Sequence, residues 1–142
     1  MIEVKHLTKK YGSGVAVSDL SFKVESGKIY GFLGPNGAGK STTMNIIAGC
    51  LAPTEGQVLI GGYDICEEPD EAKRLIGYLP EQPPLYPDMT PEEYLTFVGR
   101  AKGLRGADLH EEIEYVMDAT CIGGMRSRLI KNLSKGYKQR VG

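Results

Sequence analysis

The 142 residues, 41% of them hydrophobic and 25% charged, have the composition of a globular domain with an apolar core. No apolar run approaches the roughly 18 residues of a membrane span, and the N-terminus lacks the basic start and long apolar segment of a signal peptide. The net charge of −1 gives no support to nucleic-acid binding. We therefore expect one soluble, cytosolic domain.

The N-terminal segment alternates apolar and polar residues over 1–5 and again over 16–24, on either side of a turn at 11–14. This pattern predicts antiparallel strands exposed on one face. Tyr11 stands in the turn beside glycines, so its ring is either uncovered or folded over the sheet edge. A further strand is predicted at 57–60.

Residues 34–41, Gly-Pro-Asn-Gly-Ala-Gly-Lys-Ser, match the phosphate-binding loop with two glycines five apart followed by Lys and Ser. A buried strand is predicted before it at 28–33 and a helix after it at 41–48. Glycines let backbone N–H groups converge on phosphate oxygens. Lys40 would contact the β- and γ-phosphates, and the Ser41 hydroxyl would hold Mg²⁺. The alternative, a glycine-rich turn before an ordinary helix, would match the four specified positions by chance in roughly one percent of chains of this length.

The middle of the chain leads to a proline-rich loop. A short helix is predicted over 67–75 from its acidic start and basic end, followed by a brief buried strand at 76–79. The loop at 81–89 then carries one amide side chain, Gln82. Ligands gather at such strand ends, which makes Gln82 a candidate site residue.

Two helices are predicted after this loop. Thr90, Pro91 and Glu93 give the first an N-cap, a proline at its first position and a capping box. Asp108 and Glu111 give the second a similar start. Its apolar face is formed by Leu109, Ile113, Val116 and Met117.

The last residues and the isolated cysteines and histidines complete the pattern. Ser134 is expected to cap a helix that starts near Lys135. The three cysteines form neither a disulfide framework nor a metal site, and we expect buried, reduced thiols. The two histidines have no second ligand at metal spacing, which favours structural or surface roles. These residues are Cys50, Cys66, Cys121, His6 and His110.

Taken together, the loop at 34–41, Gln82 in its proline-rich loop and the run Leu-Ser-Lys-Gly-Tyr at 133–137 resemble the ATP-binding subunits of ABC transporters over the whole chain. The resemblance implies that Gln82 touches Mg²⁺ and the membrane subunit, and that an aromatic at the position of Tyr11 stacks on adenine. The run at 133–137 corresponds to the signature that caps the γ-phosphate of an opposing subunit. Lys135 and Tyr137 depart from the usual signature, in a form similar to bacterial exporters.

The resemblance implies site residues position by position. Lys40 and Gln82 would be catalytic, and Ser41 and Gln82 would hold the metal. The residues that would contact the nucleotide are Tyr11, Gly34, Pro35, Asn36, Gly37, Ala38, Gly39, Lys40, Ser41, Thr42, Ser134 and Gly136.

The implied fold is α/β, a P-loop NTPase fold of ABC type with an N-terminal antiparallel β subdomain, a partial parallel core sheet and a helical subdomain. Residues 1–142 would form one ATP-binding domain. Its parts would be the β subdomain and phosphate-loop core (1–79), the glutamine loop (80–90), the helical subdomain (91–133) and the signature with the start of its helix (134–142).

The implied function is ATP binding and hydrolysis, with Mg²⁺, in a dimer with a second ATP-binding subunit. Closure of the dimer would drive export through a transmembrane permease subunit, with the domain cytoplasmic and peripheral on the inner face of the membrane. No partner nucleic acid is expected. The family pattern continues with a strand ending in Asp and Glu and with a switch histidine, none of which lies in 1–142. We therefore expect an incomplete C-terminus and no hydrolysis by this chain alone.

Two other functions remain open from the sequence. A soluble nucleotide kinase would use Lys40 for phosphoryl transfer and would need lid arginines, for which Arg126, Arg128 and Arg140 are candidates. An ABC-type ATPase outside transport would be favoured by a long coiled-coil insertion, which does not follow Gln82.

Overall fold

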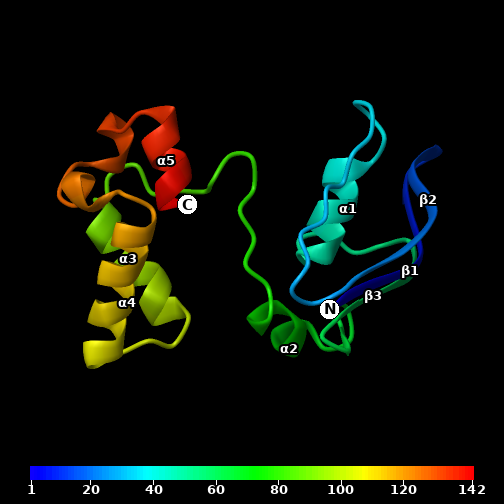
Figure 1. The fold of residues 1–142 in the computed structure, drawn as a ribbon. Helices are drawn as coiled ribbons and strands as arrows, with labels where there is room; N and C mark the ends of the chain where they lie inside the picture. Colours follow the sequence, from blue (N-terminus) through cyan, green and yellow to red (C-terminus); the bar gives the residue numbers. More distant parts are fainter. The chain divides into compact units, whose positions relative to one another are not determined.

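Two hydrophobic cores form in the chain, one within Met1–Tyr78, the sheet unit, and one within Leu79–Gly142, the helical unit. The structure, a computed structural model, describes all of residues 1–142 (Figure 1). None of its helices is long and apolar enough to span a membrane. The subdivision of one domain that the sequence suggests stays a prediction.

The sheet unit contains a four-stranded antiparallel sheet in the order β2-β1-β3-β4. Its strands are β1 (Ile2–Tyr11), β2 (Gly14–Val24), β3 (Glu55–Ile60) and β4 (Tyr63–Asp64). Val4 of β1 faces Phe22 on one side and Val58 on the other. The predicted antiparallel strands are therefore confirmed.

A bulge in β1 keeps two buried side chains on the same face. Val4 and Leu7 are both buried, although residues three apart in a regular strand point to opposite faces. The register shifts between them, and His6 has a φ of 49°. Its ring nitrogen Nδ1 lies 2.7 Å from a carboxylate oxygen of Asp19, which also has a positive φ. The extra residue therefore turns Leu7 back toward the core.

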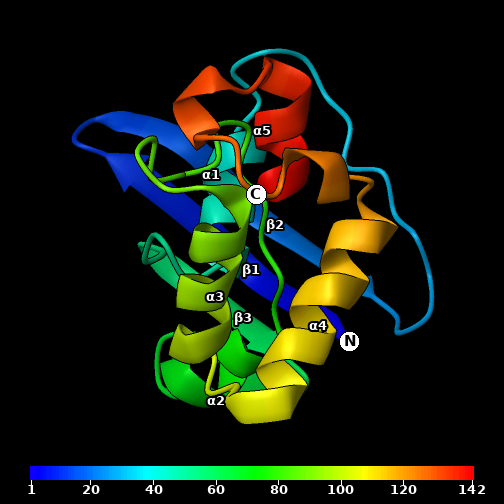
Figure 2. The ribbon, with the colours of Figure 1, turned by 90° about the vertical axis from the view of Figure 1, so that its left-hand side faces the viewer.

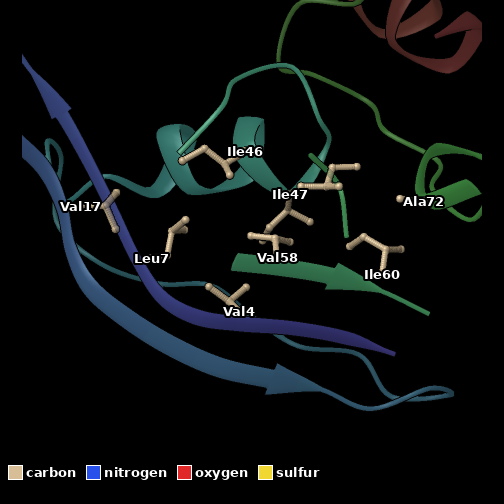
Figure 3. Close-up of a cluster of buried hydrophobic side chains, with 9 residues drawn as sticks. Val4, Leu7, Val17, Ile46, Ile47, Val58, Ile60 and Ala72 are labelled. Carbon is tan, nitrogen blue, oxygen red and sulfur yellow. The ribbon is translucent and has the colours of Figure 1, made fainter. Parts of the chain in front are cut away.

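Helix α1 (Lys40–Ile47) covers one face of this sheet, and α2 (Pro69–Arg74) lies at its edge (Figure 3). Ile46 and Ile47 point from α1 toward Leu7 and Val58. The helix ends before Gly49, whose φ of 69° suits glycine. The predicted helix at 41–48 is confirmed, and the phosphate loop is anchored directly on the core.

The predicted buried strands at 28–33 and 76–79 are not formed, so the predicted partial parallel core sheet is absent from residues 1–142. The side chains of Ile29 and Leu33 are almost fully exposed, and Leu79 is half-exposed. An extended segment becomes a strand only when a neighbour pairs with its N–H and C=O groups. All the strand pairs of this structure are antiparallel and lie within the sheet of β1, β2, β3 and β4. Neither of the two segments therefore has a strand to pair with.

The helical unit consists of three α-helices and two short 3₁₀ turns. Helices α3 (Pro91–Ala101) and α4 (Gly106–Ala119) lie side by side (Figure 2). The turns η1 (Gly123–Met125) and η2 (Ile130–Asn132) lead to α5 (Lys135–Val141). The core of this unit contains Leu109, Ile113 and Met117, as their spacing predicts.

One predicted helix start is confirmed and the other is wrong. Thr90 accepts a hydrogen bond from the N–H of Glu93, and the Glu93 carboxylate accepts one from the N–H of Thr90. Helix α4, in contrast, starts at Gly106 without a side-chain cap, so Asp108 lies inside its first turn. Gly106 itself has a φ of 55°, in the left-handed region that glycine adopts readily, so the chain enters the helix through a glycine instead of the predicted Asp108 cap.

The cysteines are exposed free thiols, so their predicted burial is wrong. Cys50 and Cys121 follow the ends of α1 and α4, and Cys66 lies in the turn after β4. Such chain reversals run over the surface, which explains the exposure.

Candidate functional site

The phosphate loop crosses from the exposed segment 28–33 to the start of α1. The N–H of Ala38 donates a hydrogen bond to the Pro35 carbonyl at 3.3 Å, which closes a turn around Asn36 and Gly37. Gly37 and Gly39 have φ values of 83° and 81°, in the region that favours glycine. The loop is therefore shaped by its glycines.

Gly39 is also the point at which the loop meets the sheet. A Cβ atom here would overlap the carbonyl oxygen of Ala16 and would lie 2.8 Å from a methyl carbon of Val17. The Gly39 carbonyl accepts hydrogen bonds from the backbone N–H and the hydroxyl of Thr43, at 2.8 and 3.0 Å. Contact with β2 on one side and α1 on the other fixes the end of the loop.

Lys40 folds back over the loop. Its ammonium donates to the carbonyl oxygens of Gly34 and Pro35, each at 2.7 Å. No carboxylate forms an ion pair with it. The ammonium is therefore held beside the loop by neutral acceptors, which phosphate oxygens can replace with a gain in charge complementarity.

The remaining loop residues offer polar groups to solvent. Gly34 to Ala38 and Ser41 are exposed, and Thr42 is half-buried. Ser41 and Thr42 lie in the first turn of α1, where backbone N–H groups lack partners within the helix. The predicted residues 34–42 thus lie together at the start of α1, and their contact with phosphate stays a prediction.

Tyr11 occupies the end of β1 and remains 54% exposed. Its partner across the sheet is Gly14, which has no side chain to cover the ring. Of the two positions left open by the sequence, the uncovered ring is therefore the one observed.

Gln82, Ser134 and Gly136 belong to the helical unit. Gln82 is exposed and lines a groove of about 410 Å³ whose cations are Lys131, Lys135 and Lys138. Of these, Lys131 pairs with Asp88 at 2.8 Å, and Lys138 donates to the Lys131 carbonyl at 3.2 Å.

Ser134 caps α5 as predicted. Its hydroxyl oxygen accepts a hydrogen bond from the N–H of Tyr137 at 3.4 Å. Gly136 faces open space, so no neighbour within the chain demands glycine there. The candidate site residues therefore form two groups, residues 11 and 34–42 in the sheet unit and residues 82, 134 and 136 in the helical unit. The shared metal site predicted for Ser41 and Gln82 stays a prediction.

Two of the arginines that are candidates for a kinase lid form hydrogen bonds within the helical unit. The guanidinium of Arg126 donates to Glu92 at 3.0 Å and to Glu114 at 2.6 Å. Arg140 donates to the carbonyl of Thr120 at 3.3 Å and lies over the Tyr137 ring. These groups stabilise the helical unit, which weakens the kinase alternative.

Comparison with known proteins identifies the family. The family described as "ABC transporter" matches residues 17–142. The chain is 40% identical over 141 residues to the probable multidrug ABC transporter ATP-binding protein YbhF of Escherichia coli (strain K12), covering 99% of the chain and 24% of that protein. It is 35% identical over 141 residues to the linearmycin resistance ATP-binding protein LnrL of Bacillus subtilis (strain 168), covering 99% and 45%. The chain thus spans less than half the length of these relatives.

Solved structures agree with this result. The structure of an ATP-binding subunit of an ABC transporter has a TM-score of 0.89 at 34% identity, covering 99% of this chain and 59% of that one. A dimeric ATP-binding cassette in a post-hydrolysis state, bound to ADP and Pi, has a TM-score of 0.86 at 27% identity, covering 99% and 66%. Sequence motifs, fold and relatives agree, and the chain belongs to the ABC transporter family.

Proposed function

We propose that residues 1–142 bind ATP as part of the ATP-binding subunit of an ABC transporter. The observation that carries the proposal is the position of the Lys40 ammonium, 2.7 Å from two carbonyl oxygens of a glycine-shaped loop at a helix start. Such a loop presents several donors to a group that has only acceptors. The named functions of YbhF and LnrL, in multidrug transport and linearmycin resistance, favour export as the direction of transport.

In this proposal, each residue of the loop contacts a defined part of the nucleotide. Lys40 binds the β- and γ-phosphates, and the backbone N–H groups of residues 36–39 surround the phosphate oxygens. The hydroxyl of Ser41 and the amide oxygen of Gln82 are hard oxygen donors that fit Mg²⁺. Both side chains are exposed and free of protein hydrogen bonds in the structure. Tyr11 offers its uncovered ring to adenine.

The proposal extends to partners. Two copies would enclose ATP, with Ser134 and Gly136 of one subunit facing the γ-phosphate on the other. The dimeric form of the ATP-binding cassette among the similar structures supports this arrangement. The Gln82 loop would transmit the closure of the dimer to a transmembrane permease subunit. The ATP-binding subunit would therefore lie at the cytoplasmic face of a membrane.

The test is ATP binding by Lys40→Ala, measured by titration calorimetry with Mg²⁺ present. Removing an ammonium from two phosphates should weaken binding by at least tenfold, about 1.4 kcal/mol. Lys23→Ala is the matched control, because Lys23 is an exposed lysine of β2 without an ion pair. Equal affinities for Lys40→Ala and the unchanged chain would refute the proposal.

A further inference from the structure

The ammonium of Lys9 lies against the Tyr11 ring. Its nitrogen is 5.2 Å from the ring centroid, within the range of a cation–π contact. The same nitrogen donates a hydrogen bond to the Ala52 carbonyl at 2.8 Å. One lysine thus joins the exposed ring to the segment that follows α1, and all three residues belong to the sheet unit.

The local structure explains why Lys9 reaches the ring. Lys9 and Tyr11 lie two residues apart in β1, close enough for the long Lys9 side chain to reach the ring. Gly14, opposite Tyr11, provides no side chain that could support the ring from β2. Tyr11 takes part in no aromatic pair. The Lys9 ammonium is therefore in a position to orient the ring.

We propose that Lys9 is a positioning residue for the nucleotide base, a role that rests on the function proposed above. Lys9 holds one face of the Tyr11 ring, and the opposite face receives the adenine. An exposed tyrosine without such a contact loses rotational freedom when a base stacks on it, and this ordering lowers affinity. Lys9 reduces that cost, because it restricts the ring before the nucleotide arrives.

The hydrogen bond to the Ala52 carbonyl fixes the position of the Lys9 ammonium beside the ring. Ala52 follows α1, and the start of the same helix carries Lys40. The hydrogen bond from Lys9 therefore connects the base platform to the segment that follows the helix carrying the phosphate site. Lys9 itself touches neither base nor phosphate in this proposal.

Lys10 is a natural control. Its ammonium pairs with Glu55 at 2.7 Å, and its backbone N–H donates to the hydroxyl of Thr54 at 3.0 Å. It is the neighbouring lysine on the same strand, yet its ammonium makes no cation–π contact with the Tyr11 ring. Lys10→Met therefore removes one strand ammonium and the hydrogen bond that it donates, as Lys9→Met does, while leaving the cation at the ring in place.

The experiment compares ATP with inorganic tripolyphosphate, which has the phosphates and no base. Affinities are measured by calorimetry for the unchanged chain, Lys9→Met, Lys9→Arg and Lys10→Met. Lys9→Met should weaken ATP binding by about two- to fivefold, the equivalent of an exposed cation–π contact. Tripolyphosphate binding should not change. Lys9→Arg, which keeps the cation, should restore ATP affinity, and Lys10→Met should bind both ligands as the unchanged chain does.

A double variant separates positioning from structural support. In a Tyr11→Ala background, Lys9→Met should have no further effect on ATP affinity, because the ring it orients is gone. Additive losses, or an equal loss for ATP and tripolyphosphate, would overturn the role of Lys9. Failure of the proposed function would appear separately, as ATP binding that does not depend on Lys40.

Discussion

Gly39 combines a left-handed backbone with a close approach to β2. Alanine at this position would be strained at a φ of 81°, and its Cβ would overlap the Ala16 carbonyl oxygen. Since backbone atoms must move to relieve that overlap, we expect Gly39→Ala to destabilise the chain by clearly more than the ~1 kcal/mol of a left-handed residue. Urea unfolding followed by circular dichroism measures the loss.

Gly37→Ala is the matched control for this prediction. Gly37 has nearly the same φ, 83°, but a Cβ there would meet no atom within 4 Å. Only the backbone strain remains, and the loss should be about 1 kcal/mol. Equal losses for the two variants would contradict the view that contact with β2 demands glycine at position 39.

At the scale of elements, Arg126 joins α3, α4 and the turn after η1. Its guanidinium bridges Glu92 of α3 and Glu114 of α4, and the hydrogen bond from Arg126 lowers the pKa of Glu114. A carboxyl group whose pKa is lower in the folded state stabilises the fold above its unfolded pKa. That contribution is lost as the pH falls through the lower, folded value.

The resulting prediction concerns Glu114→Gln. At pH 7 this variant should melt below the unchanged chain, and the difference should shrink as the pH falls through the lowered pKa of Glu114, where the carboxylate becomes protonated in the folded chain as well. Glu112→Gln, on the same helix and without an ion pair, should show no such pH-dependent difference. Thermal melting followed by circular dichroism at several pH values measures both. A difference that persists unchanged into acid would contradict the assignment.

Elements set by local contacts could be predicted, and those set by distant partners could not. The capping box of Thr90 and Glu93 closes within four residues, and the alternation in β1 and β2 is visible along the chain. The prediction of strands at 28–33 and 76–79 was wrong, because apolar content indicates burial but does not show which strand would pair with the segment. The predicted start of α4 was wrong, because the positive φ of Gly106 cannot be read from the cap pattern.

The same distinction applies to the site. The loop at 34–41 is contiguous, and its glycines and Lys40 could be predicted from spacing alone. The contact of Lys9 with Ala52 joins residues 43 positions apart, and the sequence carries no signal for it. Arg126 and its two partners, Glu92 and Glu114, likewise come from separate parts of the chain.

For the molecule as a whole, we expect ATP binding without steady hydrolysis by residues 1–142. Attack by water needs a carboxylate positioned as a base. The Lys40 ammonium contacts carbonyl oxygens only, and Glu81, the acid beside Gln82, lies in a loop whose proposed role is coupling. Phosphate release, measured beside Lys40→Ala, tests this. Steady turnover that disappears in Lys40→Ala would show that a base is present within these residues.

The exposed thiols described above give the molecule native attachment points for spectroscopic probes. Cys50 and Cys66 belong to the sheet unit, and Cys121 belongs to the helical unit. Desolvation and the carboxylates of Asp64 and Glu67 raise the pKa of the Cys66 thiol, so near neutral pH it forms less of the reactive thiolate. With Cys66 replaced by serine, spin labels on Cys50 and Cys121 would form a single pair. Pulsed resonance measurements on that pair would give the distribution of distances between the two units, with and without nucleotide.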